Sequence, residues 1–229
     1  ITNGNSASVY LVMAQTDPEK GHKGINCLIV EKDMNGFVVG KKEDKLGIRG
    51  SDTHSLMFTD VKVPKENVLG DPEEGFKALM RFLADERLMA AIRCLANARR
   101  ATEITIEFVI DRKMFGQTLG DMQNTRFKVA EMKTQIDMCQ AFVDQSVCAQ
   151  LTGSLSAEIA AEVKLAASEI ESKTVDECVQ LHGGAGYMEE YEIARLYANA
   201  RVSRIYAGSS EIMKEINSRA AGLDPRKKG

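Results

Sequence analysis

The sequence predicts an α+β protein, in which an incomplete antiparallel β domain is followed by an antiparallel four-helix-bundle C-terminal domain. Two patterns support this class. Short apolar runs separated by turn signals occur before Leu69, and apolar residues recur at helical spacing after Pro72. Only one further proline, Pro225, interrupts the second part. We therefore expect a β domain over residues 1–70 and a helical domain over residues 71–229.

The N-terminal part contains short apolar runs that are typical of β-strands. They cover residues 9–14, 25–30, 37–39 and 55–58. Turn sequences separate them, namely Thr16-Asp17-Pro18, Asn35-Gly36 and Arg49-Gly50-Ser51. About four or five strands are marginal for an independent sandwich, so we expect part of a sheet or barrel. The chain also opens abruptly at Ile1, inside a strand and turn, and we expect it to be a fragment.

Helical periodicity dominates the rest of the chain. Long helices are predicted over residues 73–113, 122–152 and 156–182, and shorter ones over 189–197 and 209–220. Long helices joined by short loops favour an antiparallel bundle.

Composition limits the classes of function. With 229 residues, of which 44% are hydrophobic, the chain can bury a sizeable core. A net charge of -3 and the lack of a basic stripe interleaved with aromatics argue against nucleic-acid binding. The 5 cysteines include no CxxC pair, which argues against a disulfide framework and a metal site and indicates a reducing compartment. No apolar run reaches the length of a membrane span.

Residues 180–211 are the most informative part of the chain. They contain two motifs, Gln180-x-x-Gly183-Gly184-x-Gly186-Tyr187 and Tyr206-Ala207-Gly208-Ser209-Ser210-Glu211. Closely spaced glycines end a helix and let backbone amides approach a ligand. Ser209 after Gly208 indicates a helix start, whose free N–H groups suit a phosphate, a carbonyl oxygen or a flavin edge. The alternative is a glycine-rich loop between packed helices, which does not account for the second motif.

This segment resembles the C-terminal signature of the acyl-CoA dehydrogenase family. In that signature, Gln-x-x-Gly-Gly-x-Gly-aromatic is followed by an acidic or amide residue, a basic residue and another acidic or amide residue. Every specified position is filled, by Gln180, Gly183, Gly184, Gly186, Tyr187, Glu190, Arg195 and Asn199. The resemblance extends along the whole chain and implies that the family's N-terminal helical domain is absent. We therefore expect the fragment alone to be inactive.

Desaturation of a thioester requires a carboxylate base, hydrogen bonds to the thioester oxygen and a flavin. Many family members carry a glutamate directly after the tyrosine of the second motif, where this chain has Ala207. Glu86 offers another carboxylate, because its neighbours at helical spacing are apolar. They are Phe82, Leu83, Met89 and Ala90. Desolvation on such a stripe strengthens a carboxylate base. The alternative is a partly solvated helix charge, and Asp85 is expected to form a surface ion pair with Arg81.

The resemblance favours Glu86 as the catalytic base. The long-chain and isovaleryl-CoA dehydrogenase branches place their base in a Glu-Arg-Leu segment of the first long helix, which residues 86–88 match. Those branches also have a small residue where this chain has Ala207, and the long-chain branch is the more similar. Ala207 would donate its backbone N–H to the thioester oxygen. The substrate-binding residues that the resemblance implies are Asp85, Arg87, Tyr206, Ala207 and Gly208.

The resemblance also implies FAD as the cofactor. Thr2, after Ile1, would lie near the flavin N5, and Arg112 of an Arg-x-x-Phe-Gly motif would meet the pyrophosphate of FAD bound mainly to a neighbouring subunit. A guanidinium suits paired hydrogen bonds to phosphate. The implied cofactor-binding residues are Ile1, Thr2, Arg112, Phe115, Gln123, Gln180, Gly183, Gly184, Gly208, Ser209 and Glu211. Without the resemblance, Arg112 is equally well a basic residue at a helix end, and His182 is expected to end a helix rather than to catalyse.

The implied activity is the dehydrogenation of fatty acyl-CoA thioesters to trans-2-enoyl-CoA in fatty-acid β-oxidation. A homotetramer would pass the electrons to an electron-transfer flavoprotein, in the bacterial cytoplasm or the mitochondrial matrix. Three alternatives stay open: an acyl-CoA oxidase, an isovaleryl-CoA-type dehydrogenase, and a catalytically silent helical assembly fragment. The sequence leaves acyl chain length open.

Overall fold

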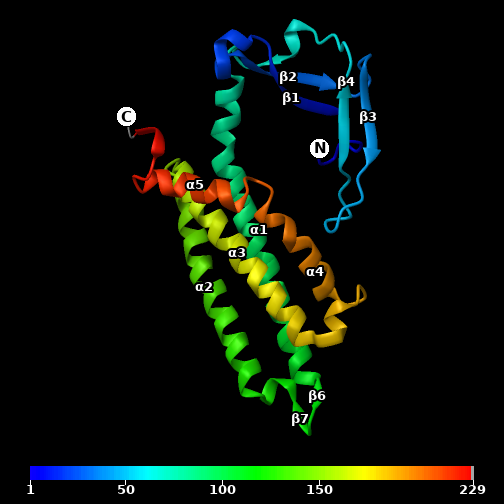
Figure 1. Ribbon diagram of the computed structural model, residues 1–229, viewed down its shortest axis with the longest axis vertical. Helices are drawn as coiled ribbons and strands as arrows, with labels where there is room; N and C mark the ends of the chain where they lie inside the picture. The colour runs from blue at the N-terminus through cyan, green and yellow to red at the C-terminus, as the bar shows by residue number, and fades with distance from the viewer. Residues whose placement is uncertain (228–229) are drawn as a thin grey trace. The chain divides into compact units, whose positions relative to one another are not determined.

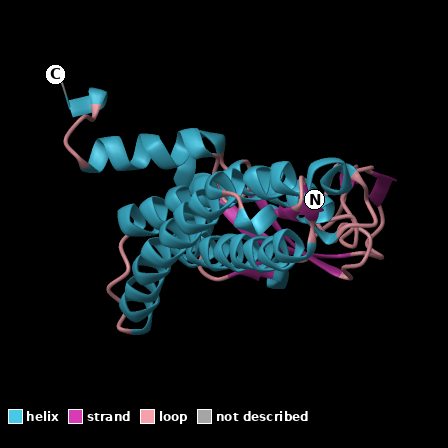
Figure 2. Cartoon of the chain, turned by 90° about the horizontal axis from the view of Figure 1, so that it is seen from below, coloured by secondary structure: helices cyan, strands magenta, loops and turns pink. Residues whose placement is uncertain are grey.

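The computed structural model describes residues 1–227 and divides into two compact units. The first unit covers Ile1–Phe82, and the second begins at Leu83. Helices make up most of the chain, and the strands are few and short (Figure 2). This confirms the predicted α+β class with small antiparallel sheets.

The first unit holds two small antiparallel sheets. Strands β1 (Val9–Gln15) and β2 (Ile25–Glu31) pair along their full length, with Val9 opposite Glu31, and β5 (Val68–Leu69) adds to β2. Strands β3 (Phe37–Lys42) and β4 (His54–Phe58) form the second pair. The four longer strands were predicted, whereas β5 was not, because two residues carry no readable alternation.

Alternation along the strands builds the core of this unit. Tyr10, Val30 and Phe37 are buried, and the rings of Tyr10 and Phe37 lie 4.8 Å apart. On the opposite face of β1, the side chains of Val9 and Leu11 are exposed. The period of two therefore puts one face of β1 into the core and leaves the other outside.

Asp52 ties the N-terminal segment to this unit. The backbone N–H groups of Asn5 and Ser6 donate to its carboxylate at 2.8 and 3.3 Å, and the Ser6 hydroxyl also donates to it. The hydrogen bonds from Ser6 and Asn5 lower the pKa of Asp52 from 3.8 to about 2. Because the folded-state pKa lies below the unfolded value, these bonds stabilise the fold above pH 3.8 and are lost as pH falls towards 2.

Replacing Asp52 by asparagine is expected to weaken this attachment at neutral pH. The amide protons of Asn5 and Ser6 should exchange faster with solvent than in the wild type, because the ionised acceptor is gone. Unfolding curves of the two proteins should converge as pH falls towards 2 and below, because the wild-type carboxylate becomes protonated as pH passes through its pKa of about 2. Asp33→Asn, at an exposed turn, is the control and should match the wild type. A constant difference at all pH values would contradict the prediction.

The helical unit contains α1 (Gly75–Asp111) from Leu83 onward, α2 (Gln123–Leu151) and α3 (Ala157–His182), with the shorter α4 (Glu192–Ala200) and α5 (Ser210–Ala220). Figure 1 shows α2 and α3 running along one another, with α4 beside α3 and α5 crossing it. Each predicted helix is present with ends shifted by a few residues. A two-residue hairpin, β6 (Lys113–Met114) and β7 (Gln117–Thr118), joins α1 to α2.

Two buried clusters hold these helices together. One contains Leu88 and Ala91 of α1, Val143 of α2 and Val163 of α3. The other contains Met132, Val175, Cys178 and Ile193 among its members. Serines cap two helices: the Ser156 hydroxyl accepts from the Ile159 N–H at 3.2 Å, and the Ser209 hydroxyl accepts from the Ile212 N–H at 3.4 Å.

In the part of the chain that the structure describes, we find no disulfide, no cluster of metal ligands and no membrane-spanning helix. Its cysteines are unpaired; Cys148 is exposed and the other four are buried. Within residues 1–227, no group of three or more His, Cys, Asp or Glu is arranged to hold a metal ion. No helix of the described residues is long and apolar enough to cross a membrane.

Candidate functional site

A cavity of about 540 Å³ lies where α1 and α3 end and α2 begins. Arg112 lines it from the end of α1, and Gln180, Gly183 and Gly184 line it from the end of α3. These residues are far apart in the sequence, so the folding of the bundle brings them together. The cavity therefore unites four of the residues predicted to bind a cofactor.

The three glycines of the first motif have different structural roles. Gly183 ends α3 with φ 59°, a conformation that glycine adopts readily. A Cβ at Gly183 or Gly184 would meet no atom within 4 Å, so the backbone here is open to an approaching group. A Cβ at Gly186 would lie 2.6 Å from the carbonyl oxygen of Val179, so this glycine is required for packing.

The donors around the cavity fit a phosphate-bearing cofactor. A guanidinium, a side-chain amide and an accessible backbone are the groups that commonly hold a pyrophosphate. Lys128 adds a further cation to the cavity wall and forms an ion pair with Glu177. Lys128 and Asn124 were not predicted from the sequence. Their spacing of four on one helix face, close to the predicted glutamine contact, could have revealed them.

Two predicted cofactor residues lie beside this cavity and do not line it. Phe115 is at the tip of the β6–β7 hairpin, has φ 51° and is 89% exposed. Gln123 is the exposed first residue of α2, although its neighbours Met122 and Asn124 do line the cavity. The roles of Phe115 and Gln123 stay predictions.

His182 ends α3, as expected from the sequence. Its Nδ1 lies 2.7 Å from the Cys178 carbonyl oxygen, and its ring stacks on Phe108 at 4.3 Å. Burial lowers the pKa of His182, which favours the neutral ring. His182 and Phe108 also line the cavity, and these contacts account for His182 through helix termination and packing in its wall.

The second motif forms a tightly held turn between α4 and α5. Ala207 has φ 51° and Gly208 has φ 90°. Arg93 of α1 donates to the Tyr206 hydroxyl and lies over its ring, 5.6 Å from the centroid. Lys164 of α3 donates to the Gly208 carbonyl oxygen at 2.6 Å. The first residue of the turn thus contacts a side chain of α1, and its last residue contacts a side chain of α3.

The predicted base is more solvated than the sequence indicated. The side chain of Glu86 is exposed, and its neighbours Phe82 and Met89 are 68% and 66% exposed. The expected desolvation is therefore wrong for this chain, because Glu86 lies on the exposed side of α1 with Phe82 and Met89, whereas Ala90 is buried and Leu83 is half-buried. The expected ion pair between Asp85 and Arg81 is also wrong, since Arg81 lies 3.9 Å from Glu74 instead.

Arg87, next to Glu86, is a buried cation with an unmet donor. Only 8% of it is exposed, and its Nε has no hydrogen-bond partner among the described residues. Burial lowers the pKa of Arg87, and the charge of Glu86 opposes that shift. An unsatisfied buried donor costs about 1–3 kcal/mol, so this position favours binding of an acceptor that the described residues do not supply.

The remaining predicted residues are distributed over both units. Thr2 forms a β-bridge with Thr53 in the first unit, and Ile1 is 67% exposed. Glu211 is exposed in the first turn of α5, where hydrogen bonds from its own backbone and from Ser209 lower its pKa. Their parts in cofactor binding stay predictions.

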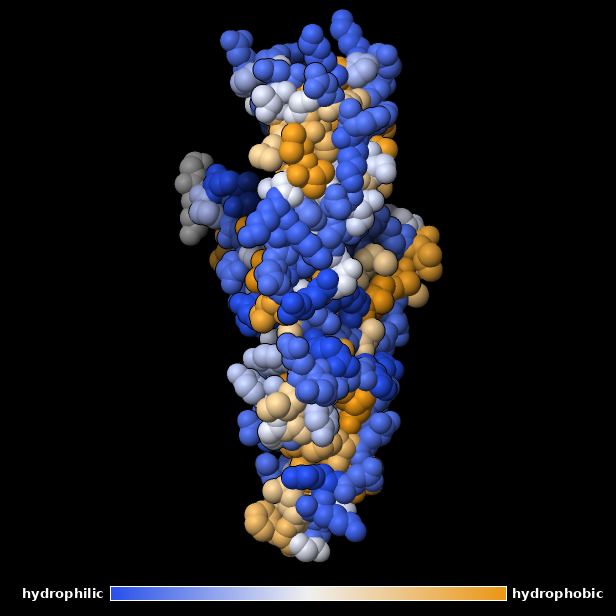
Figure 3. All heavy atoms as spheres, turned by 90° about the vertical axis from the view of Figure 1, so that its right-hand side faces the viewer, coloured by the Kyte–Doolittle hydropathy of each residue, from blue (hydrophilic) through white to orange (hydrophobic). Residues whose placement is uncertain are grey.

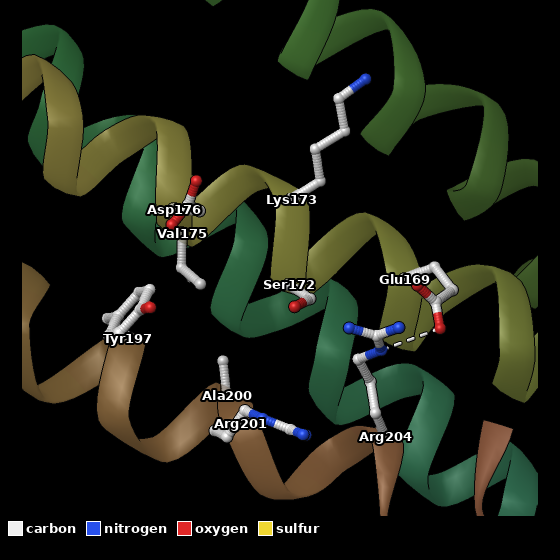
Figure 4. A pocket seen from close by; sticks show the side chains of 9 residues that line it. All are labelled: Glu169, Ser172, Lys173, Val175, Asp176, Tyr197, Ala200, Arg201 and Arg204. Atoms are coloured by element: carbon white, nitrogen blue, oxygen red, sulfur yellow. Dashed lines mark hydrogen bonds and ion pairs between the residues drawn. The ribbon is translucent and has the colours of Figure 1, made fainter.

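A separate surface pocket of about 270 Å³ lies between α3 and the segment around α4 (Figure 4). Its polar lining includes Lys173, Asp176 and Arg201, together with Glu169 and Arg204, which form an ion pair at 2.9 Å. No residue predicted from the sequence to bind substrate or cofactor lines this pocket.

Two family profiles match the chain. The profile described as "Acyl-CoA dehydrogenase, C-terminal domain" matches residues 73–222, and the one described as "Acyl-CoA dehydrogenase, middle domain" matches residues 1–61. The residues of the cavity and of the 206–208 turn all fall within the first match.

Similar proteins agree with these profiles. The chain is 40% identical to the short-chain-specific acyl-CoA dehydrogenase of Megasphaera elsdenii, covering 96% of this chain and 57% of that protein. It is 42% identical to the mitochondrial long-chain-specific acyl-CoA dehydrogenase of Sus scrofa, covering 96% and 51%. An acyl-CoA dehydrogenase structure from Geobacillus kaustophilus matches with a TM-score of 0.95 at 41% identity, covering 97% of this chain and 59% of that one. The chain thus spans about half the length of these curated relatives, and it belongs to the acyl-CoA dehydrogenase family.

Proposed function

We propose that the protein carrying this chain is an FAD-dependent dehydrogenase that converts fatty acyl-CoA thioesters to trans-2-enoyl-CoA in fatty-acid β-oxidation. The observation that carries this proposal is the cavity that joins Arg112 to Gln180, Gly183 and Gly184. Its donors and open backbone suit the phosphates and adenosine of a dinucleotide. Membership of the family supports FAD as that dinucleotide.

Several parts of the chain would hold the cofactor. Arg112 would pair with the pyrophosphate, and the backbone at Gly183 and Gly184 would admit the adenosine end beside Gln180. Phe115 and Gln123 would contribute from the rim, across a subunit boundary. The other proposed contacts are Ile1, Thr2, Gly208, Ser209 and Glu211. FAD, when bound, would supply the acceptor for the hydride that leaves Cβ.

The chain's own residues would carry the proton transfer. The Glu86 carboxylate takes the α proton, and the electron pair of that C–H bond moves towards the thioester oxygen. The Ala207 N–H donates to this oxygen, from the turn that Tyr206 and Gly208 shape. Buried Arg87 and neighbouring Asp85 would line the acyl-CoA site. The exposure of Glu86 leaves room for a thioester at the surface of α1, where bound substrate would displace water.

A long-chain substrate is our first choice, since the Glu-Arg-Leu segment and the small Ala207 resemble that branch. The relatives named for short-chain and long-chain specificity are 40% and 42% identical, so overall identity favours neither length. Anaerobic mixing of the holoenzyme with butyryl-, isovaleryl-, octanoyl- and palmitoyl-CoA should bleach the flavin absorbance fastest with palmitoyl-CoA. Failure of all four thioesters to bleach it would contradict the proposed function.

The natural electron acceptor is proposed to be an electron-transfer flavoprotein. After substrate bleaching, oxygen should restore the flavin absorbance slowly and electron-transfer flavoprotein should restore it rapidly. The opposite order would instead identify an acyl-CoA oxidase. A chain that holds no FAD at all would act only as a helical assembly module.

Exposed apolar residues support assembly into the homotetramer that the family resemblance implies. Figure 3 shows apolar patches among polar residues on one face of the molecule. The exposed large apolar residues of the helical unit include Phe115, Phe127, Met138, Leu151 and Tyr187. Such exposure is typical of interaction surfaces. Light scattering on the holoenzyme should give the mass of four chains.

We also propose that the protein is located in the bacterial cytoplasm or the mitochondrial matrix.

Replacing Arg112 by methionine is expected to weaken FAD binding about 10- to 100-fold, the loss of a charge-assisted contact of about 1.5–3 kcal/mol. Fluorescence titration of the apoprotein with FAD measures the dissociation constant. Arg99→Met is the matched control, because Arg99 is exposed on the same helix and bonds to Gln140 at 3.1 Å. Equal affinities for the two variants would rule out a cofactor contact by Arg112.

A further inference from the structure

The turn at residues 206–208 adopts a backbone that is unfavourable for its sequence. Ala207 has φ 51°, in the left-handed region, where a residue with a Cβ pays about 1–2 kcal/mol. Such a conformation persists only where surrounding contacts hold it. The contacts around this turn are therefore needed to hold Ala207 in its left-handed conformation.

Lys164 is the most unusual of these contacts. It is fully buried in α3, and its ammonium donates to the Gly208 carbonyl oxygen at 2.6 Å. The α3 residues around it, Ala160, Ala161 and Ala167, are small and buried. Burial lowers the pKa of Lys164 and the charge of Arg87 adds to this shift, while the carboxylates of Glu169 and Glu171 oppose it. A buried ammonium is costly to keep, so a contact that requires its donor explains its presence better than packing does.

Glu169, a second residue of α3, accepts hydrogen bonds from residues on both sides of the same turn. One carboxylate oxygen of Glu169 accepts from Arg204 Nε at 2.9 Å and from the Ser210 hydroxyl at 2.9 Å. Arg204 precedes the turn and Ser210 follows it, and Figure 4 shows the Arg204 contact. Together with the hydrogen bond from Lys164 to the Gly208 carbonyl oxygen, α3 thus contacts the residues before the turn, the last residue of the turn and the residue that starts α5.

We propose that Lys164 is a positioning residue for the thioester-binding turn. By fixing the Gly208 carbonyl, its ammonium keeps Ala207 in its left-handed conformation and so keeps the Ala207 N–H oriented for the thioester oxygen. This inference rests on the proposed function. Lys164 does not touch the substrate and acts through the turn.

The chemistry makes this orientation important. When Glu86 takes the α proton, negative charge collects on the thioester oxygen, and a donor stabilises it only at about 2.7–3.1 Å. A misplacement of about 1 Å can cost about 100-fold in rate. A donor held in place before the reaction avoids that loss.

Lys164→Met in the holoenzyme tests the proposal, because methionine has a similar length and needs no hydrogen-bond partner. We expect kcat to fall about 10- to 100-fold with KM nearly unchanged, as for an interaction made in the transition state. The unfolding temperature should stay at or above that of the wild type, because an apolar side chain replaces a buried charge. Lys173→Met, at an exposed lysine of the same helix, is the matched control and should retain full activity.

A second measurement isolates the proton transfer. In 3-thiabutyryl-, 3-thiaoctanoyl- and 3-thiadodecanoyl-CoA a sulfur replaces Cβ, so the α proton can leave but no hydride can follow. The ionised thioester then gives a long-wavelength absorbance band with FAD. In Lys164→Met the midpoint pH of this band should rise by about 1–2, the equivalent of a 10- to 100-fold weaker stabilisation of the anion.

The possible outcomes separate the inference from the function it rests on. A normal band in the wild type with an unchanged midpoint in Lys164→Met would overturn the role of Lys164 alone. A lower unfolding temperature with an unchanged midpoint would assign Lys164 to stability only, and would overturn the proposal as well. The absence of a band in the wild type with all three probes would overturn the proposed function and, with it, this inference.

Discussion

Glu86→Gln in the holoenzyme is expected to slow flavin bleaching by acyl-CoA about 100- to 10,000-fold, the usual contribution of a general base. Glutamine keeps the size of the side chain but cannot accept the α proton. Because Glu86 is exposed on α1, the substitution should leave the unfolding temperature unchanged. Stopped-flow absorbance under anaerobic conditions, with the best acyl-CoA substrate, measures the bleaching rate.

Two further variants make this test specific. Glu103→Gln replaces another exposed carboxylate of α1 and should bleach at the wild-type rate. Adding Ala207→Glu to Glu86→Gln should restore part of the rate if both positions reach the same carbon. Recovery should be incomplete, since residue 207 has φ 51° and a glutamate there keeps the strain of the turn. Fast bleaching by Glu86→Gln alone would remove Glu86 from the mechanism.

Substitutions at two glycines of the first motif are expected to have different effects: Gly186→Ala should lower stability, and Gly184→Ala should weaken cofactor binding. Gly186→Ala should lower the free energy of unfolding by about 1–3 kcal/mol, as overpacking does. The reason is that its Cβ would lie 2.6 Å from the Val179 carbonyl oxygen and 2.9 Å from the His182 side chain. Backbone cannot move aside as easily as a side chain. Denaturant unfolding of the apoprotein measures this loss.

Gly184→Ala is the matched substitution. Its Cβ would meet no atom within 4 Å, so the free energy of unfolding should stay within about 0.5 kcal/mol of the wild type. The added methyl group would occupy the space open beside the cavity, and FAD affinity should fall. If Gly184→Ala were the more destabilising of the two, or bound FAD as tightly as the wild type, the assignment of the two glycines would be wrong.

Local sequence patterns determine much of the architecture. The period of 3.6 in residues 75–111, 123–151 and 157–182 and the period of two in the longer strands come from local burial patterns, which are written into neighbouring residues. The signature at residues 180–211 likewise predicted the family. The strands β5, β6 and β7 were missed, because two residues are too few to show a period.

The three-dimensional packing decided matters that no local pattern carries. It separated Gly183 and Gly184, which border open space, from Gly186, which has none. It exposed Glu86 despite its apolar neighbours, since a helix periodicity does not say which stripe the bundle covers. It also joined Lys164 of α3 to Gly208 of the turn before α5, two residues that no local pattern of the sequence connects. Local spacing reports which residues share a face, whereas long-range packing alone reports what that face meets.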